Sequence, residues 1–293
     1  MPPQLLQPDF LNKLEQLSLV ARKIFTGRAR GERRSKKQGI SVEFADYRDY
    51  TPGDDLRFID WNIYGRLDRL LLKLFLEEED VFIYLIVDTS KSMSFGDPAK
   101  IDYAKRVAAS LGYIALTSME RVSVNAFSAQ LDEALPVARG RSSVWRLFDA
   151  LEGLECDGQT SLADSLHQFA IRHSRAGIVV VLSDFFDPRG YEDGLKFLLQ
   201  RQFDVCVINT LSPEDVAPQI GGHLRLYDSE TGDFTEVTAS DMLLKSYRRM
   251  YDAFASGLKG YCTRHGMAYT LATTDRPFDR LVLESLRRGG MVK

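Results

Sequence analysis

Two short runs of almost uninterrupted apolar residues constrain the fold of this chain most strongly. They cover residues 81–87 and 178–183, with the sequences VFIYLIV and IVVVLS. A strand with one face in water alternates apolar and polar residues, whereas a continuous apolar run of this length is typical of a strand buried on both faces of a parallel sheet. We therefore expect both runs to be inner strands of such a sheet.

The rest of the C-terminal part alternates strand patterns with helical patterns. Further strands are predicted at 121–127, 204–209 and 267–272. Helical patterns lie between the strands, at 98–118, 142–154, 161–174, 190–201, 241–265 and 278–288. Residues 222–238 have the pattern of a β-hairpin with its turn near residues 231–233. This order predicts an α/β domain over 81–293, with a doubly wound, mostly parallel sheet of the Rossmann type and a small hairpin insertion.

Residues 1–80 differ in composition from the rest of the chain and are predicted to form an N-terminal extension. Asp9 is a suitable cap for a first helix. The stretch 22–37 then holds eight basic residues against the single acid Glu32: Arg22, Lys23, Arg28, Arg30, Arg33, Arg34, Lys36 and Lys37. Two interpretations stay open for this basic segment, a solvated linker or a patch for nucleic acid or an acidic partner.

The next stretch, 40–61, interleaves acids with arginines and aromatic residues around a turn at Pro52 and Gly53. Arginine–carboxylate pairs beside packed aromatic rings can pin a small irregular segment that has little core. The stretch is therefore either pinned in this way or used as a surface for a partner, and the two interpretations are compatible.

Composition narrows the class of protein. The 293 residues are 44% hydrophobic and 27% charged, as in an ordinary globular protein, and the net charge of −3 argues against a dedicated nucleic-acid binder. No apolar stretch approaches the roughly 20 residues that span a bilayer, and the N-terminus lacks the pattern of a signal peptide. Three widely spaced cysteines do not form a disulfide framework. We expect a cytoplasmic protein without a membrane span.

Five oxygen-bearing residues follow the predicted strands or begin a predicted helix: Asp88, Ser90, Ser92, Thr160 and Asp184. Ligands bind in open α/β sheets at the ends where the strands finish. Carboxylate and hydroxyl oxygens suit Mg²⁺, with Mn²⁺ or Ca²⁺ as alternatives, and no His or Cys lies near these positions to favour a softer metal. Alone, the Asp-x-Ser-x-Ser motif is a weak signal, Thr160 is equally explained as a helix cap, and Asp184 has the alternative of a polar strand end. Together they predict a metal site.

These residues resemble the metal-ion-dependent adhesion site (MIDAS) of von Willebrand factor A domains, in which Asp-x-Ser-x-Ser is followed by a distant Thr and a distant Asp. The earlier segments 43–48, 52–57 and 59–61 are similar to the signature of the bacterial domain-of-unknown-function 58 family, in which that signature precedes a von Willebrand A-like domain. The resemblance implies a MoxR-type AAA+ ATPase as partner, in chaperone-like assembly or maturation of other proteins. Many members of the family carry N-terminal membrane helices, which this sequence does not show.

The residues of the predicted metal site favour protein binding over catalysis. Neutral hydroxyl ligands leave a cation electron-poor, so it favours a carboxylate from an acidic client protein. The sequence has neither a P-loop for ATP nor the Gly-x-Ser-x-Gly elbow of serine hydrolases. We therefore expect a non-catalytic, Mg²⁺-dependent protein-binding module without a small-molecule substrate. Two alternatives are a metal-dependent phosphoester hydrolase with Asp88 as nucleophile, which would lack its second acid because Ser90 stands there, and nucleic-acid binding through 22–37.

Overall fold

The computed structural model describes residues 5, 7–17, 44–75 and 81–288. These residues fall into two compact units. Residues 44–75 form the smaller unit, and the described residues before 18 join 81–288 in the larger one. The basic segment 22–37 lies outside the described residues, so both interpretations of it stay predictions.

A six-stranded sheet is the centre of the larger unit. Its strands lie in the order β10-β7-β6-β3-β4-β5, and all neighbours are parallel except β5, which is antiparallel to β4. The strands are β3 (Phe82–Asp88), β4 (Arg121–Phe127), β5 (Leu131–Arg139), β6 (Ile178–Ser183), β7 (Asp204–Leu211) and β10 (Ala268–Thr273). The two apolar runs of the sequence are β3 and β6, and they pair with each other at the middle of the sheet. The prediction of a mostly parallel α/β sheet is confirmed.

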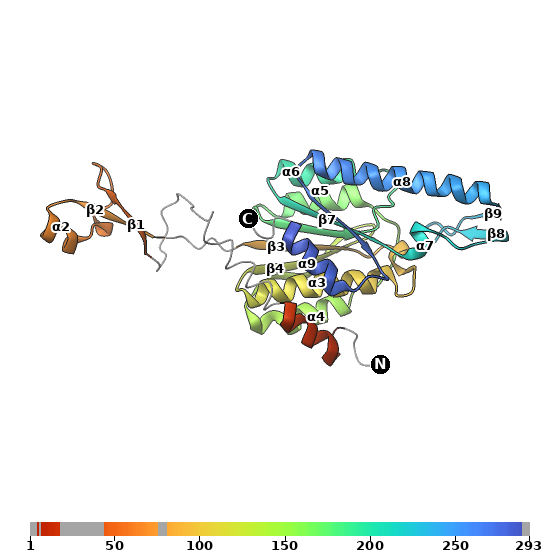
Figure 1. The fold of residues 1–293 in the computed structure, drawn as a ribbon, viewed down its shortest axis with the longest axis horizontal. Helices are drawn as coiled ribbons and strands as arrows, with labels where there is room; N and C mark the ends of the chain where they lie inside the picture. The colour runs from red at the N-terminus through yellow and green to blue at the C-terminus, as the bar shows by residue number, and fades with distance from the viewer. Residues whose placement is uncertain (1–4, 6, 18–43, 76–80, 289–293) are drawn as a thin grey trace. The chain divides into compact units, whose positions relative to one another are not determined.

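Helices cover both faces of this sheet (Figure 1). On one face lie α3 (Lys100–Thr117), α4 (Val144–Glu152) and α9 (Phe278–Arg288). On the other lie α5 (Leu162–Arg172), α6 (Glu192–Gln200) and α8 (Asp241–Arg264). Side chains alternate across a strand, so Leu85 of β3 packs in the first of these cores and Ile86 in the second. The sheet is doubly wound.

The helix at residues 8–17 packs against the larger unit, although we predicted it within the N-terminal extension. Phe10 of this helix is buried in the core that contains α3, α4 and α9. Its ring lies 5.2 Å from the ring of Phe278 and 6.4 Å from that of Phe148, measured between centroids. The apolar side of the helix therefore completes that core.

The edge strand β5 was not predicted from the sequence. Only some of its residues face the core, and Asp132 and Glu133 are exposed. Pro136 lies within the strand, and the register with β4 shifts twice. Proline is tolerated at a sheet edge because no strand beyond it needs the missing N–H group. The pattern of β5 is therefore irregular, as an edge position permits.

The smaller unit is a two-stranded antiparallel sheet with short helical turns. It contains β1 (Phe44–Asp49), η2 (Leu56–Phe58), α2 (Trp61–Leu67) and β2 (Leu71–Phe75). Arg48 makes a two-pronged contact with Asp54, with both N–O distances 2.7 Å. Asp60 caps α2. It also accepts the hydroxyl of Tyr47 at 2.9 Å and lies 3.0 Å from the ammonium of Lys73. Ion pairs and caps thus pin this small fold.

A hairpin follows β7 and the short helix α7 (Pro213–Val216). It consists of β8 (Gly222–Tyr227) and β9 (Phe234–Ala239), which pair antiparallel as the sequence indicated. Helix α7 and the hairpin lie at the same end of the unit (Figure 1). Within the described parts of the chain, every helix is too short or too polar to cross a membrane.

Candidate metal centre

Three loops at the carboxyl ends of the strands converge beside β3. The loop after β3 meets the loop before α5, where the backbone N–H of Lys91 donates to the carbonyl of Gly158 at 3.1 Å. The loop before α5 meets the loop after β6, where the N–H of Leu162 donates to Oδ2 of Asp187 at 2.9 Å. Hydrogen bonds therefore fix these loops to one another. The five residues of the predicted site lie in these loops or at the strand end that leads into them.

Four of the five predicted residues form a continuous chain of contacts. Oδ1 of Asp88 accepts the N–H of Ser90 at 2.9 Å. The hydroxyl oxygens of Ser90 and Ser92 lie 3.0 Å apart, and Ser92 donates to Oδ2 of Asp184 at 2.8 Å. Asp88, Ser90 and Asp184 are fully buried, and Ser92 is half-buried. The structure thus brings together side chains that lie up to 96 residues apart in the sequence.

The fifth residue, Thr160, lies in the neighbouring loop but bonds to a different partner. Its hydroxyl donates to Oε1 of Glu230 at 2.9 Å, and its backbone N–H donates to Oε2 of the same carboxylate at 3.1 Å. Glu230 belongs to the turn between β8 and β9. Thr160 is buried beneath this contact.

The electrostatics around Asp88 are those of a carboxylate that lacks a counter-charge. Burial, together with the neighbouring charge of Asp184, raises the pKa of Asp88 to about 7. Three hydrogen bonds oppose this shift: one from the hydroxyl of Ser183 to Oδ2 at 2.5 Å, and two from Ser90, through its N–H to Oδ1 and through its side chain. Both oxygens of Asp88 therefore accept hydrogen bonds. Because the carboxylate is buried beside a second carboxylate, a nearby positive charge would stabilise its ionised form.

A buried lysine contributes one such charge. Lys100, at the start of α3, is 2% exposed, and its ammonium lies 2.8 Å from Oδ2 of Asp184 and 3.2 Å from Oδ2 of Asp215. Burial alone would lower the pKa of Lys100, but the attraction of these two carboxylates outweighs it and the pKa is raised. The rings of Phe95 and Phe186 lie 6.0 and 5.6 Å from the ammonium. Lys100 is therefore ionised and fixed.

The donor set fits a hard divalent cation. It offers oxygen atoms alone, two carboxylates and three hydroxyls, which are the ligands that Mg²⁺, Mn²⁺ and Ca²⁺ share. Three carboxyl groups, those of Asp88, Asp184 and Asp215, lie around the single ammonium of Lys100, so acidic groups outnumber basic ones here and a divalent cation would balance them. No group of three or more His, Cys, Asp or Glu side chains in the described ranges is arranged to hold a metal. The predicted site contains only two such residues, so it depends on its hydroxyls.

Sequence reasoning missed four residues that shape this site. Ser183 and Asp215 stand at or just after the ends of β6 and β7, so the rule that ligands bind at strand ends applies to them as well. Lys100 and Glu230 carry no such signal, because a charged residue at a helix start or in a turn is normally solvated. Only the folded structure shows them at the site.

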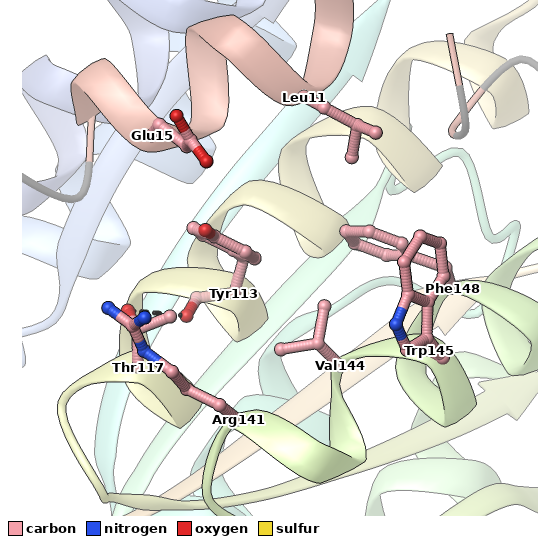
Figure 2. Close-up of a pocket in the computed structure, with 8 residues that line it drawn as sticks. All are labelled: Leu11, Glu15, Tyr113, Thr117, Arg141, Val144, Trp145 and Phe148. Carbon is pink, nitrogen blue, oxygen red and sulfur yellow. Dashed lines mark hydrogen bonds between the residues drawn. The ribbon is translucent and has the colours of Figure 1, made fainter. Parts of the chain in front are cut away.

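A separate cavity of about 240 Å³ lies at the other end of α3 (Figure 2). It is lined by the helix at 8–17, the last turns of α3, the short 3-10 turn Arg141–Ser143, and α4, with the side chains of Leu11, Glu15, Tyr113, Thr117, Arg141, Val144, Trp145 and Phe148. At 1.5 Å per residue, the end of α3 is about 25 Å from Lys100. The cavity therefore has no part in the candidate metal centre.

Solved structures similar to this chain include the crystal structure of the conserved hypothetical protein BatB from Bacteroides thetaiotaomicron. That protein is 14% identical, and the match covers 71% of this chain and 98% of BatB with a TM-score of 0.43. The manganese-loaded TRAP protein of Plasmodium vivax is 22% identical, over 44% of this chain and 57% of that one, with a TM-score of 0.35.

Relatives in sequence extend over nearly the whole chain. Uncharacterized proteins of Mycobacterium tuberculosis and Mycobacterium bovis are each 24% identical over 303 aligned residues, which cover 99% of this chain and 95% of theirs. The family described as protein of unknown function DUF58 matches residues 46–256. This match spans well over half of the chain and includes every residue of the candidate metal centre, so the chain belongs to the DUF58 family.

Proposed function

We propose that this chain is a non-catalytic, Mg²⁺-dependent protein-binding module of the von Willebrand A type. Asp88, Ser90, Ser92, Thr160 and Asp184 would hold the cation, with Mn²⁺ or Ca²⁺ as alternatives. One observation carries the proposal: two buried carboxylates and two hydroxyls contact one another where three strand-end loops converge, with an excess of negative charge. When bound, the cation supplies a positive charge to which an acidic side chain of another protein can bind.

The surroundings of Asp88 support binding rather than catalysis. A nucleophilic carboxylate needs an oxygen free to attack, whereas both oxygens of Asp88 accept hydrogen bonds from the protein and the side chain is fully buried. The contacts of Asp88 therefore orient it as a ligand. Hydrolysis of phosphoesters remains the alternative, and turnover of p-nitrophenyl phosphate by the purified chain would favour it.

We propose further that the protein acts in the cytoplasm with a MoxR-type AAA+ ATPase in the assembly or maturation of a client that bears acidic residues, as the family resemblance implies. The segment 43–61 is our candidate for the surface that meets the ATPase. In its described part and in the adjoining α2, the side chains of Leu56, Trp61 and Leu67 are 55%, 59% and 65% exposed. Three large apolar side chains exposed within twelve residues support a partner surface.

The test is recovery of a MoxR-like ATPase from the same organism by the immobilised chain. In this proposal an acidic side chain of the ATPase also contacts the bound cation, so we expect recovery in Mg²⁺, and loss of recovery both with chelator and in Asp88→Ala. Asp252→Ala is the matched control, because Asp252 is an exposed acid on α8 that pairs with Arg248 one helical turn away. Thermal unfolding of both variants checks that they fold. Equal recovery by all proteins, with and without metal, would contradict the metal-dependent contact.

A further inference from the structure

The turn between β8 and β9 is built to present Glu230. The carboxylate of Asp228 accepts the backbone N–H of Glu230 at 2.8 Å and that of Thr231 at 3.0 Å. Gly232 closes the turn with φ +78°, a conformation that favours glycine, and its N–H donates to the carbonyl of Asp228 at 2.9 Å. The backbone at Glu230 is therefore fixed by local hydrogen bonds. Residues 225–229 are exposed, whereas Glu230 is half-buried.

The side chain of Glu230 ends on Thr160, a residue of the candidate metal centre 70 positions earlier in the chain. Both carboxylate oxygens are used, one by the hydroxyl of Thr160 and the other by its backbone N–H. A hydroxyl has one proton to donate and lone pairs to offer. Thr160 therefore donates to Glu230 and keeps lone pairs for a cation, so this contact and a bound metal are compatible.

This contact is the main anchor of the hairpin. Neither β8 nor β9 has a buried residue. Among the described residues, the hydrogen bonds that join 222–239 to the rest of the larger unit are the two from Thr160 to Glu230. An element with so little buried surface opens at low cost in free energy. The hairpin tip therefore stays on the site mainly through one carboxylate.

From these observations we infer that Glu230 is an internal carboxylate that covers the Thr160 side of the metal centre, and that an acidic partner must displace it to bind. The inference rests on the proposed function, since it identifies what competes with the partner at the same site. The hairpin is then a gate, which means that its opening controls access of a partner to the metal centre. The chain's own glutamate occupies the place that an aspartate or glutamate of another protein would take.

Docking of the hairpin is tested first without metal, by amide hydrogen exchange measured at Thr160. In Glu230→Gln one acceptor oxygen remains, but an NH₂ group replaces the other, so the two donors of Thr160 are no longer both satisfied. We expect exchange at Thr160 to be about tenfold faster in this variant, the effect of losing on the order of one charge-assisted hydrogen bond. Glu236→Gln is the control, because it removes the same charge from the same hairpin, where Glu236 pairs with Arg225 instead. Unchanged exchange in Glu230→Gln would overturn the inference whether or not the protein binds metal.

Gating is tested by the affinity of the Mn²⁺-loaded protein for poly-L-glutamate, used as a carboxylate probe. The observed affinity is the intrinsic affinity multiplied by the open fraction, so with about one tenth of the wild type open we expect Glu230→Gln to bind about tenfold more tightly than the wild type and Glu236→Gln. Equal, Mn²⁺-dependent affinity in all three proteins would overturn the gate and leave the proposed function standing. Absence of Mn²⁺-dependent binding in all three would contradict the proposed function and the gate together.

Discussion

Replacement of the buried Lys100 by methionine tests the charge balance of the metal centre. Methionine preserves much of the apolar stem but removes the ammonium that lies 2.8 Å from Asp184 and 3.2 Å from Asp215. The side chains of these two acids are 1% and 13% exposed, so water does not replace the lost partner. Loss of one member of a buried ion pair costs about 3–5 kcal/mol. At about 2–4 °C per kcal/mol for a domain of this size, we expect Tm to fall by about 6–20 °C without metal.

Divalent metal should reverse part of this loss. The variant site is more negative, and the repulsion between the ammonium and a divalent cation is gone, so the variant should bind Mg²⁺ more tightly than the wild type. Metal that binds only the folded state raises its stability by RT ln(1 + [Mg²⁺]/Kd). Each tenfold decrease in Kd therefore adds about 1.4 kcal/mol to the stabilisation by metal. The rise in Tm on addition of Mg²⁺ should be larger in Lys100→Met than in the wild type.

The measurement is differential scanning calorimetry with and without Mg²⁺. Lys105→Met on the same helix is the matched control, because the ammonium of Lys105 donates to the carbonyl oxygens of Glu152 and Leu154 and not to a carboxylate. It should lose stability but show the same metal-induced rise in Tm as the wild type. An equal or smaller rise in Lys100→Met than in the wild type would refute the reasoning about charge.

Two further predictions concern the fold. The paired guanidinium of Arg48, with the backbone and hydroxyl of Thr51, holds the pKa of Asp54 well below its usual range. This ion pair therefore stabilises the smaller unit above the unfolded pKa of about 4, and its contribution is lost as the pH falls through the folded pKa. An NMR titration of the Asp54 carboxyl should show the low pKa and its rise in Arg48→Lys; a value near 4 in the wild type would contradict it. Gly112→Ala would place a Cβ 2.6 Å from Leu147 and should destabilise the larger unit by about 1–3 kcal/mol in urea unfolding, whereas Gly260→Ala, with open space around it, should stabilise by up to about 1 kcal/mol. Equal effects of the two alanine substitutions would argue against tight packing of α3 on α4.

The inner sheet was predictable because its strands are buried on both faces. Continuous apolar runs as short as those at 81–87 and 178–183, separated by helical patterns, are typical of strands inside a parallel sheet. The edge strand β5 was missed because an edge tolerates exposed acids and a proline, which leave no regular pattern. The packing of the helix at 8–17 was missed for a related reason: an apolar stripe shows that a helix is buried, but not which unit it packs against.

The candidate site was predictable in part. Asp88, Ser90, Ser92 and Asp184 were identified from their positions at strand ends, and the structure places these four in contact. The residues that set the net charge of the site and that cover its Thr160 side were not identified from the sequence. Lys100 becomes a buried counter-ion and Glu230 a cover only through tertiary contacts with residues 84 and 70 positions away.

Binding of Mn²⁺, followed by electron paramagnetic resonance, tests the central claim most directly. Mn²⁺ is the paramagnetic stand-in for Mg²⁺, and competition by Mg²⁺ shows that both ions use the same site. We predict a single bound Mn²⁺ per chain that Mg²⁺ displaces, that is lost in Asp88→Ala and Asp184→Ala, and that is retained in Asp252→Ala. A folded wild-type chain that binds no Mn²⁺, or Mn²⁺ binding that survives both substitutions at the strand ends, would contradict a metal centre at this position.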